Sequence, residues 1–166
     1  GMASLDTGDY VISGLRNDGV NNVPILVRIQ YGEQTLVSCL DVNNGVNNAY
    51  VTPPAVLGDQ VFVAAGLQPF ASGALTSRIK GFVAPADGTV PVPAPGYGSN
   101  GMVEWSYPYS TSNASNNRSF VQRLYFDPAY GLMAVGTRTW NGNDTDVALA
   151  RFGSTGVIFR NGFEAD

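Results

Sequence analysis

The sequence contains no histidine and only one cysteine, and 13% of its 166 residues are charged. Without histidine, the chain cannot form a Ser-His-Asp or Cys-His hydrolytic site, and it lacks the usual histidine ligands of zinc. The single cysteine, Cys39, cannot form a disulfide within the chain, and its neighbours in Leu-Val-Ser-Cys-Leu indicate a small buried apolar side chain. No apolar run approaches the ~20 residues that a membrane-spanning helix needs, so we expect no membrane insertion.

Basic residues are few and scattered along the chain. Lys80 is the only lysine, and with a net charge of −4 the nine Lys and Arg residues provide no cluster that could neutralise phosphates. We therefore expect no nucleic-acid partner. Apolar residues make up 44% of the chain, the ordinary level of a globular protein, and the length predicts one all-β domain over residues 3–166. Gly1-Met2 is interpreted as an addition that precedes the native residues.

Alternating apolar runs, separated by turn residues, predict about a dozen short strands and no helix. Dipeptides such as Asp87-Gly88 and Asn141-Gly142 supply the positive φ angles of tight hairpins. The 20 glycines and 10 prolines interrupt any 3.6-residue pattern. We therefore predict an all-β fold, an antiparallel β-sandwich. The expected strands span 10–13, 25–30, 35–40, 49–52, 60–66, 75–83, 89–92, 102–107, 120–126, 132–137, 147–152 and 157–159.

A strand that ends in glycine is followed three times by a strand that carries one basic residue. The three pairs are Gly14 and Arg28, Gly66 and Lys80, and Gly136 and Arg151, separated by 14, 14 and 15 residues. Such a repeat leaves a propeller-like or trefoil-like closure open as alternatives to the sandwich, as well as a fragment or half of an assembly completed by a second copy. The basic residue could pair with a carboxylate of the adjacent unit, or its stem could cover an apolar face while its head reaches water.

The third copy contains Phe126-Asp127-Pro128, then Gly-Leu-Met-Ala-Val-Gly over 131–136 and Asp-Val-Ala-Leu-Ala-Arg-Phe over 146–152. These residues resemble one blade of a family of bacterial secreted β-propeller repeats, in which an apolar strand ending in Ala-Gly precedes Phe-Ala-Leu-Ala-Arg. The closing turn, Gly-Ser-Thr-Gly over 153–156, departs from that pattern because it lacks the family's aspartate. Three copies are too few for a closed propeller, which takes about four to eight blades.

The C-terminal residues Ile-Phe-Arg-Asn-Gly-Phe-Glu over 158–164 are similar to the Ile-Phe-x-Asp-Gly-Phe-Glu tail of many exported proteins of gammaproteobacteria. The resemblance implies export and a secreted or cell-surface location. The alternative is a final strand followed by a frayed polar end.

Most of the candidate aromatic residues lie in the sequence between the second and third copies. Trp105, Tyr107 and Tyr109 alternate, so in a strand they share one face, and Trp140 and Asn141 begin an Asn/Asp-rich loop. Aromatic faces beside amide side chains bind sugars by stacking and hydrogen bonding, although the same aromatics could instead fill the core. We therefore predict an exported, non-enzymatic binding or structural module without a cofactor, with these five residues as the candidate site for a glycan or cell-surface partner. Association into a homo-oligomer is a further expectation.

The competing hypothesis is a carboxylate-dependent glycoside hydrolase. Glu104 lies beside Trp105, and Glu33 is the only other glutamate before the C-terminal tail. A hydrolase would need two carboxyl groups about 5 Å or ~6.5–9.5 Å apart. The Asn and Asp residues of 141–146 alternate as calcium ligands do, but they are also ordinary hairpin residues. We therefore predict neither a catalytic residue nor a metal site.

Overall fold

The computed structural model describes most of the chain as strands joined by turns, and no helix occurs among the residues that it describes. No part of this described chain therefore supplies a helix long and apolar enough to cross a membrane. The described residues are 1–17, 19–20, 22–32, 36–41, 48–67, 76–95, 97–105, 118–127, 129, 131–140, 144–153 and 156–158.

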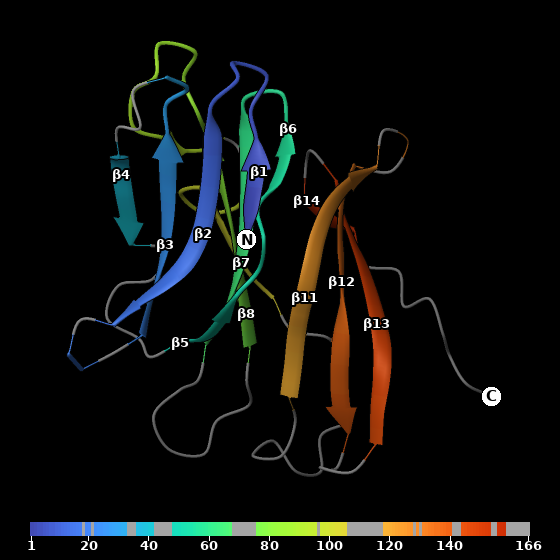
Figure 1. Cartoon of the computed structure of the whole chain (residues 1–166). Coiled ribbons are helices and arrows are strands. Elements are labelled where there is room, and N and C mark those ends of the chain that lie inside the picture. Colours follow the sequence, from blue (N-terminus) through green and yellow to red (C-terminus); the bar gives the residue numbers. More distant parts are fainter. Residues whose placement is uncertain are drawn as a thin grey trace.

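Three antiparallel sheets follow one another along the chain, with four, six and four strands, and we name them sheets A, B and C (Figure 1). Sheet A is a simple meander in which each strand pairs with the next. Val11 and Leu26 lie on its buried face, and Ile12 and Val27 lie on the opposite face, as the alternation of a strand requires. Its strands are β1 (Met2–Ser4), β2 (Tyr10–Asn17), β3 (Asn22–Ile29) and β4 (Leu36–Asp41).

Sheet B is the middle layer. Its strands are β5 (Asn48–Val51), β6 (Ala55–Leu57), β7 (Gln60–Leu67), β8 (Thr76–Val83), β9 (Val92–Pro93) and β10 (Met102–Trp105). The main order is β10-β8-β7-β5, while β6 also pairs with β7 and β9 with β8. Every residue from Val61 to Ala65 is buried, so β7 is covered on both faces. Its continuous apolar run is typical of a strand between two layers.

Sheet C is again a meander of consecutive strands. An irregularity in the pairing of its first two strands leaves Gln122 without a partner in the register, since Val121 lies opposite Gly136 and Arg123 lies opposite Val135. Its strands are β11 (Arg118–Asp127), β12 (Gly131–Trp140), β13 (Asp144–Gly153) and β14 (Gly156–Ile158).

Two apolar cores join the layers, one on each face of sheet B. The core between sheets A and B contains Leu5, Val11, Leu26, Val61, Val63, Ala65, Phe82 and Ala84. The core between sheets B and C contains Ala55, Phe62, Ala64, Ile79, Val121, Leu124, Leu132, Ala134, Ala148, Ala150 and Phe152. Sheets A and C therefore lie on opposite sides of sheet B, and the stack of open sheets is sandwich-like, which confirms the predicted all-β antiparallel fold.

Each predicted strand overlaps a strand of the structure, but two short strands were not predicted. β1 includes Met2, which the sequence indicates to be an added residue. β6 follows Pro53-Pro54 and has only three residues. The prediction for 89–92 is largely wrong, because the strand β9 is Val92–Pro93. Thr89 instead closes a turn, where its amide and hydroxyl both bind the carboxylate of Asp87.

Candidate functional site

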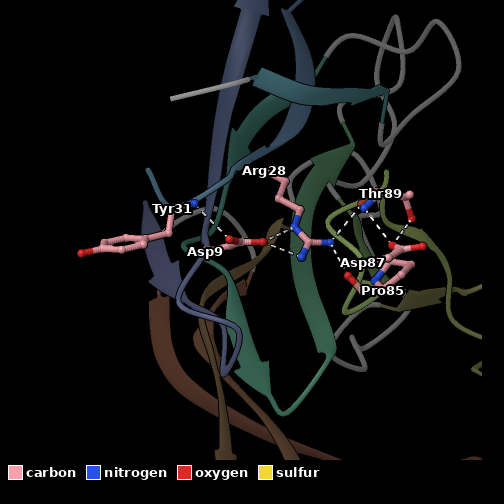
Figure 2. A network of polar contacts seen from close by, with 6 residues as sticks. All are labelled: Asp9, Arg28, Tyr31, Pro85, Asp87 and Thr89. Carbon is pink, nitrogen blue, oxygen red and sulfur yellow. Dashed lines mark hydrogen bonds and ion pairs between the residues drawn. The ribbon is translucent and has the colours of Figure 1, made fainter. Parts of the chain in front are cut away.

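The most developed polar cluster of the described chain surrounds Arg28 of β3, on the face of sheet A that packs against sheet B (Figure 2). Its side chain is fully buried, and Asp9, which precedes β2, is 5% exposed. The Nε and Nη2 atoms of Arg28 donate to Oδ2 of Asp9 at 2.9 and 2.5 Å. A buried guanidinium needs such a partner, because an unpaired charge in the interior is strongly destabilising.

Sheet B completes the cluster with two backbone carbonyls. Nη1 of Arg28 donates to the carbonyl oxygens of Pro85 at 2.7 Å and Thr89 at 3.0 Å. The turn between these residues contains Asp87, whose carboxylate accepts the amide and hydroxyl of Thr89, and Gly88, whose φ is +81°. An Asp-Gly turn therefore presents both carbonyls to the guanidinium, as Figure 2 shows.

The second oxygen of Asp9 is also occupied, since Oδ1 accepts the Tyr31 amide at 3.0 Å. Burial alone would raise the pKa of Asp9. The Tyr31 amide, the Arg28 guanidinium and the Thr7 hydroxyl outweigh burial and hold the pKa of Asp9 below its ordinary value. The carboxylate therefore stays ionised opposite the arginine.

This cluster has little capacity for a ligand. Four of the five N–H donors of Arg28 are used by Asp9, Pro85 and Thr89, and both oxygens of Asp9 accept hydrogen bonds. Its chemistry is to fix sheet A against the turn of sheet B. Neither alternative for the basic residue holds at Arg28: its head is buried away from water, and its carboxylate partner comes from its own sheet, while the adjacent sheet supplies carbonyls.

The other two basic residues occupy the equivalent register in their sheets. Arg28 lies opposite Val11, Lys80 opposite Val63, and Arg151 opposite Met133. Lys80 and Arg151 are only partly buried. Of the three residues, Arg28 alone is fully buried. The contact between sheets A and B encloses it.

The structure places the backbone of two of the five predicted ligand-binding residues. Trp105 ends the described part of β10 opposite Ser77, and Trp140 ends β12 opposite Asp144. The two indole side chains lie outside the described residues, as do all atoms of Tyr107, Tyr109 and Asn141.

A tyrosine that the sequence analysis did not select lies between these strand ends. The Tyr50 hydroxyl of β5 accepts the Val121 amide at 2.8 Å and lies 2.7 Å from the hydroxyl oxygen of Ser77. Burial raises the pKa of Tyr50, against the opposing effect of these two hydrogen bonds. A Cβ atom at Gly66 would overlap the Tyr50 ring, so this glycine makes room for it. Gly66, the glycine that ends its predicted strand, is the sequence signal that could have indicated an aromatic ring packed above it.

The competing catalytic pair is only half described. Glu104 lies in β10 opposite Arg78, whereas Glu33 lies outside the described residues, as do residues 141–143 of the calcium-like loop. Within the described residues, no three His, Cys, Asp or Glu side chains gather as a metal site. Tyr97, which the sequence places near the aromatic strand, packs edge-on against Phe62 with ring centroids 4.9 Å apart and belongs to the core.

No protein-family model, no curated protein and no solved structure matches this chain.

Proposed function

We propose that the chain is an exported, non-enzymatic binding or structural module, and that its ligands are glycans. The residues assigned to binding are Trp105, Tyr107, Tyr109, Trp140 and Asn141. Export is expected from the C-terminal residues 158–164, and fractionation of the producing cells tests it, since a protein retained in the cytoplasm would contradict export.

The observation that supports a shared site is that both tryptophans end strands at one end of the neighbouring sheets B and C. Trp105 lies opposite Ser77, the second residue of β8, and in Figure 1 β8 begins and β12 ends at the lower end of their sheets. The Tyr50 hydroxyl joins the two sheets there through Ser77 and Val121. Trp140 is the last residue of β12.

The remaining three residues follow directly in the sequence. Tyr107 and Tyr109 come two and four residues after Trp105, and Asn141 comes directly after Trp140. The two strands that carry Trp105 and Trp140 therefore end at the same end of the molecule. Indole and phenol rings offer stacking surfaces to the apolar faces of sugars, and amides offer paired hydrogen bonds to their hydroxyls.

A glycan array followed by tryptophan fluorescence titration tests this function. We expect Trp105→Ala and Trp140→Ala each to weaken binding of the strongest array glycan at least about tenfold, equivalent to ~1.4 kcal/mol. Tyr125→Ala is the matched control, because Tyr125 is an exposed aromatic residue elsewhere on sheet C. An array without binding, or tryptophan variants that bind as well as the control, would overturn the proposal.

A further inference from the structure

The turn that binds Arg28 on the side of sheet B contains an Asp-Gly pair, Asp87-Gly88. Such pairs are chemically labile, because glycine has no side chain that would hinder attack of its amide nitrogen on the preceding carboxyl group. Asp87 is exposed to solvent, whereas the Arg28 side chain is fully buried. A labile pair at the surface is therefore part of the turn that receives a buried charge, as Figure 2 shows.

The shape of the turn depends on both residues of the pair. The carboxylate of Asp87 accepts the amide of Thr89 at 3.0 Å and its hydroxyl at 2.7 Å. Gly88 has a φ angle of +81°, which a residue with a Cβ atom adopts only with strain. A Cβ atom there would also overlap the side-chain amide of Gln30. The residues that form the turn are therefore the same two that make it labile.

The hydrogen bonds of the folded turn oppose reaction of the pair. The Gly88 amide, whose nitrogen would attack, donates to the Pro85 carbonyl at 3.2 Å. The hydrogen bonds from Thr89, with a smaller contribution from the charge of Arg28, hold the pKa of Asp87 below its ordinary value. The carboxyl group therefore stays ionised at neutral pH, and an ionised carboxyl group is attacked less readily than a protonated one.

We propose that Asp87 is a site of spontaneous isomerisation that Thr89 restrains, and that its conversion to isoaspartate releases Arg28 from sheet B. The Gly88 nitrogen forms a bond to Cγ of Asp87, and one carboxyl oxygen leaves as water with the amide proton and the carboxyl proton. Water then opens the cyclic succinimide at the former backbone carbonyl. The main chain now runs through Cβ and Cγ of residue 87, and the reaction needs no other reactant.

Isomerisation changes the turn in two ways. The main chain between Pro85 and Thr89 gains one methylene group, and the carboxyl group that bound Thr89 becomes a backbone amide. The two carbonyl oxygens that accept Nη1 of Arg28, at 2.7 and 3.0 Å, are then no longer held at their present separation. Because Arg28 is fully buried, a donor that loses its acceptor finds no water in its place, which destabilises the fold.

The other Asp-Gly pair of the sequence, Asp18-Gly19, is an internal reference. It connects β2 to β3, which are neighbouring strands of sheet A, so its isomerisation alters a connection within one sheet. A single incubation therefore tests both Asp-Gly pairs, of which Asp87-Gly88 belongs to the turn that binds Arg28.

Peptide mapping by mass spectrometry, after prolonged incubation of the folded protein at physiological temperature, measures isoaspartate at each site. We expect slow formation at Asp87 in the unchanged protein and at least about fivefold faster formation in Thr89→Ala, which loses one hydrogen bond to the carboxylate. General unfolding of the variant would accelerate Asp18 as well, so the ratio of the two sites separates release of the turn from unfolding. An unchanged ratio, or no isoaspartate at Asp87 in Thr89→Ala, would overturn the proposal.

Pulse proteolysis of the aged protein in urea tests the release of Arg28. We expect chains with isoaspartate at residue 87 to be digested at a urea concentration about 1 M lower than intact chains, because hydrogen bonds to a buried charge are lost. Asp87→Glu is the matched control, since glutamate keeps the charge but cyclises far less readily, and every other Asp-Gly and Asn-Gly pair is unchanged in it. Equal resistance of the isoaspartate and intact chains, or an equal loss of resistance when Asp87→Glu is aged, would contradict the release.

Discussion

The two contacts of sheet B are built from different chemistry. Toward sheet A, the contact holds the buried Arg28–Asp9 ion pair and a hydrogen bond from the Ser13 hydroxyl to the Thr52 carbonyl at 2.6 Å. Toward sheet C, the contact is mainly apolar: the Phe62 ring packs edge-on against Phe126, with centroids 5.2 Å apart. Polar groups make the first contact directional, whereas the second depends on how well volumes fit.

The difference shows where each contact is vulnerable. A buried ion pair requires both partners, because the desolvation of either charge is offset only by the other. The apolar contact loses stability in proportion to the volume removed, and no carboxylate belongs to its core. The contact with sheet A therefore depends strongly on one residue pair, whereas the contact with sheet C depends mainly on many apolar side chains.

Removing the carboxylate of Asp9 should have the largest effect. We expect Asp9→Ala to lower the free energy of unfolding by about 3–5 kcal/mol, because Arg28 would stay buried without a counter-charge. Urea denaturation followed by circular dichroism measures the loss. Asp6→Ala is the matched control, since Asp6 lies exposed in the same connection between β1 and β2. The double variant Asp9→Ala/Arg28→Met should recover part of the loss, and equal effects of Asp6 and Asp9 would contradict the role of the pair.

Acid should weaken the sheet A–sheet B contact selectively. The pKa of Asp9 in the folded chain lies below its value in the unfolded chain, which is about 3.9. Its contribution is therefore complete above pH ~4 and is lost as the pH falls further, through the folded-state pKa. In urea titrations between pH 7 and pH 2, the stability gap between the unchanged protein and Asp9→Ala should narrow at the acid end.

The pKa of Asp87 is also lowered, chiefly by its hydrogen bonds from Thr89. This second carboxylate is present in both proteins, so its acid response cancels in the comparison. A gap that stays constant down to the lowest pH would show that Asp9 does not stabilise the fold through its charge.

The smallest effect is expected at Tyr97, in the contact with sheet C. Its hydroxyl is buried without a hydrogen-bond partner among the described residues, and burial raises the pKa of Tyr97. Tyr97→Phe should leave the unfolding free energy unchanged or raise it by up to about 1 kcal/mol, because an unsatisfied group is removed. Tyr50→Phe is the contrasting variant and should cost about 1 kcal/mol, since it removes the partner of the Val121 amide. Chemical denaturation of both variants decides whether the hydroxyl of Tyr97 is a liability.

The strands were predictable because each is short, regular and bounded by turn residues. The alternation of 25–30 placed Arg28 on one face of its strand, and the unbroken apolar run of 60–66 marked a buried strand. The partners of Arg28 could not be predicted, because Asp9 is 19 residues away and the two acceptor carbonyls are 57 and 61 residues away. A backbone carbonyl has no signature in the sequence.

Only the strands that carry the candidate site could be predicted from the alternation of the sequence. Alternation placed Trp105 on an expected strand, and the structure adds that this strand pairs with β8 at Ser77. The bridging role of Tyr50 could not be predicted, because it depends on the packing of sheet C against sheet B. Glycan binding by Trp105, Tyr107, Tyr109, Trp140 and Asn141 stays a prediction.

The position of β7 has a consequence for how the protein unfolds. Its odd and even residues belong to different cores, since Val61 and Val63 pack toward sheet A while Phe62 and Ala64 pack toward sheet C. Separation of sheet A or sheet C from sheet B would therefore expose one complete apolar side of β7 to water. Although sheets A and C are local meanders, we expect the three layers to melt in one step, and the amides of β7 to be the last to exchange with solvent.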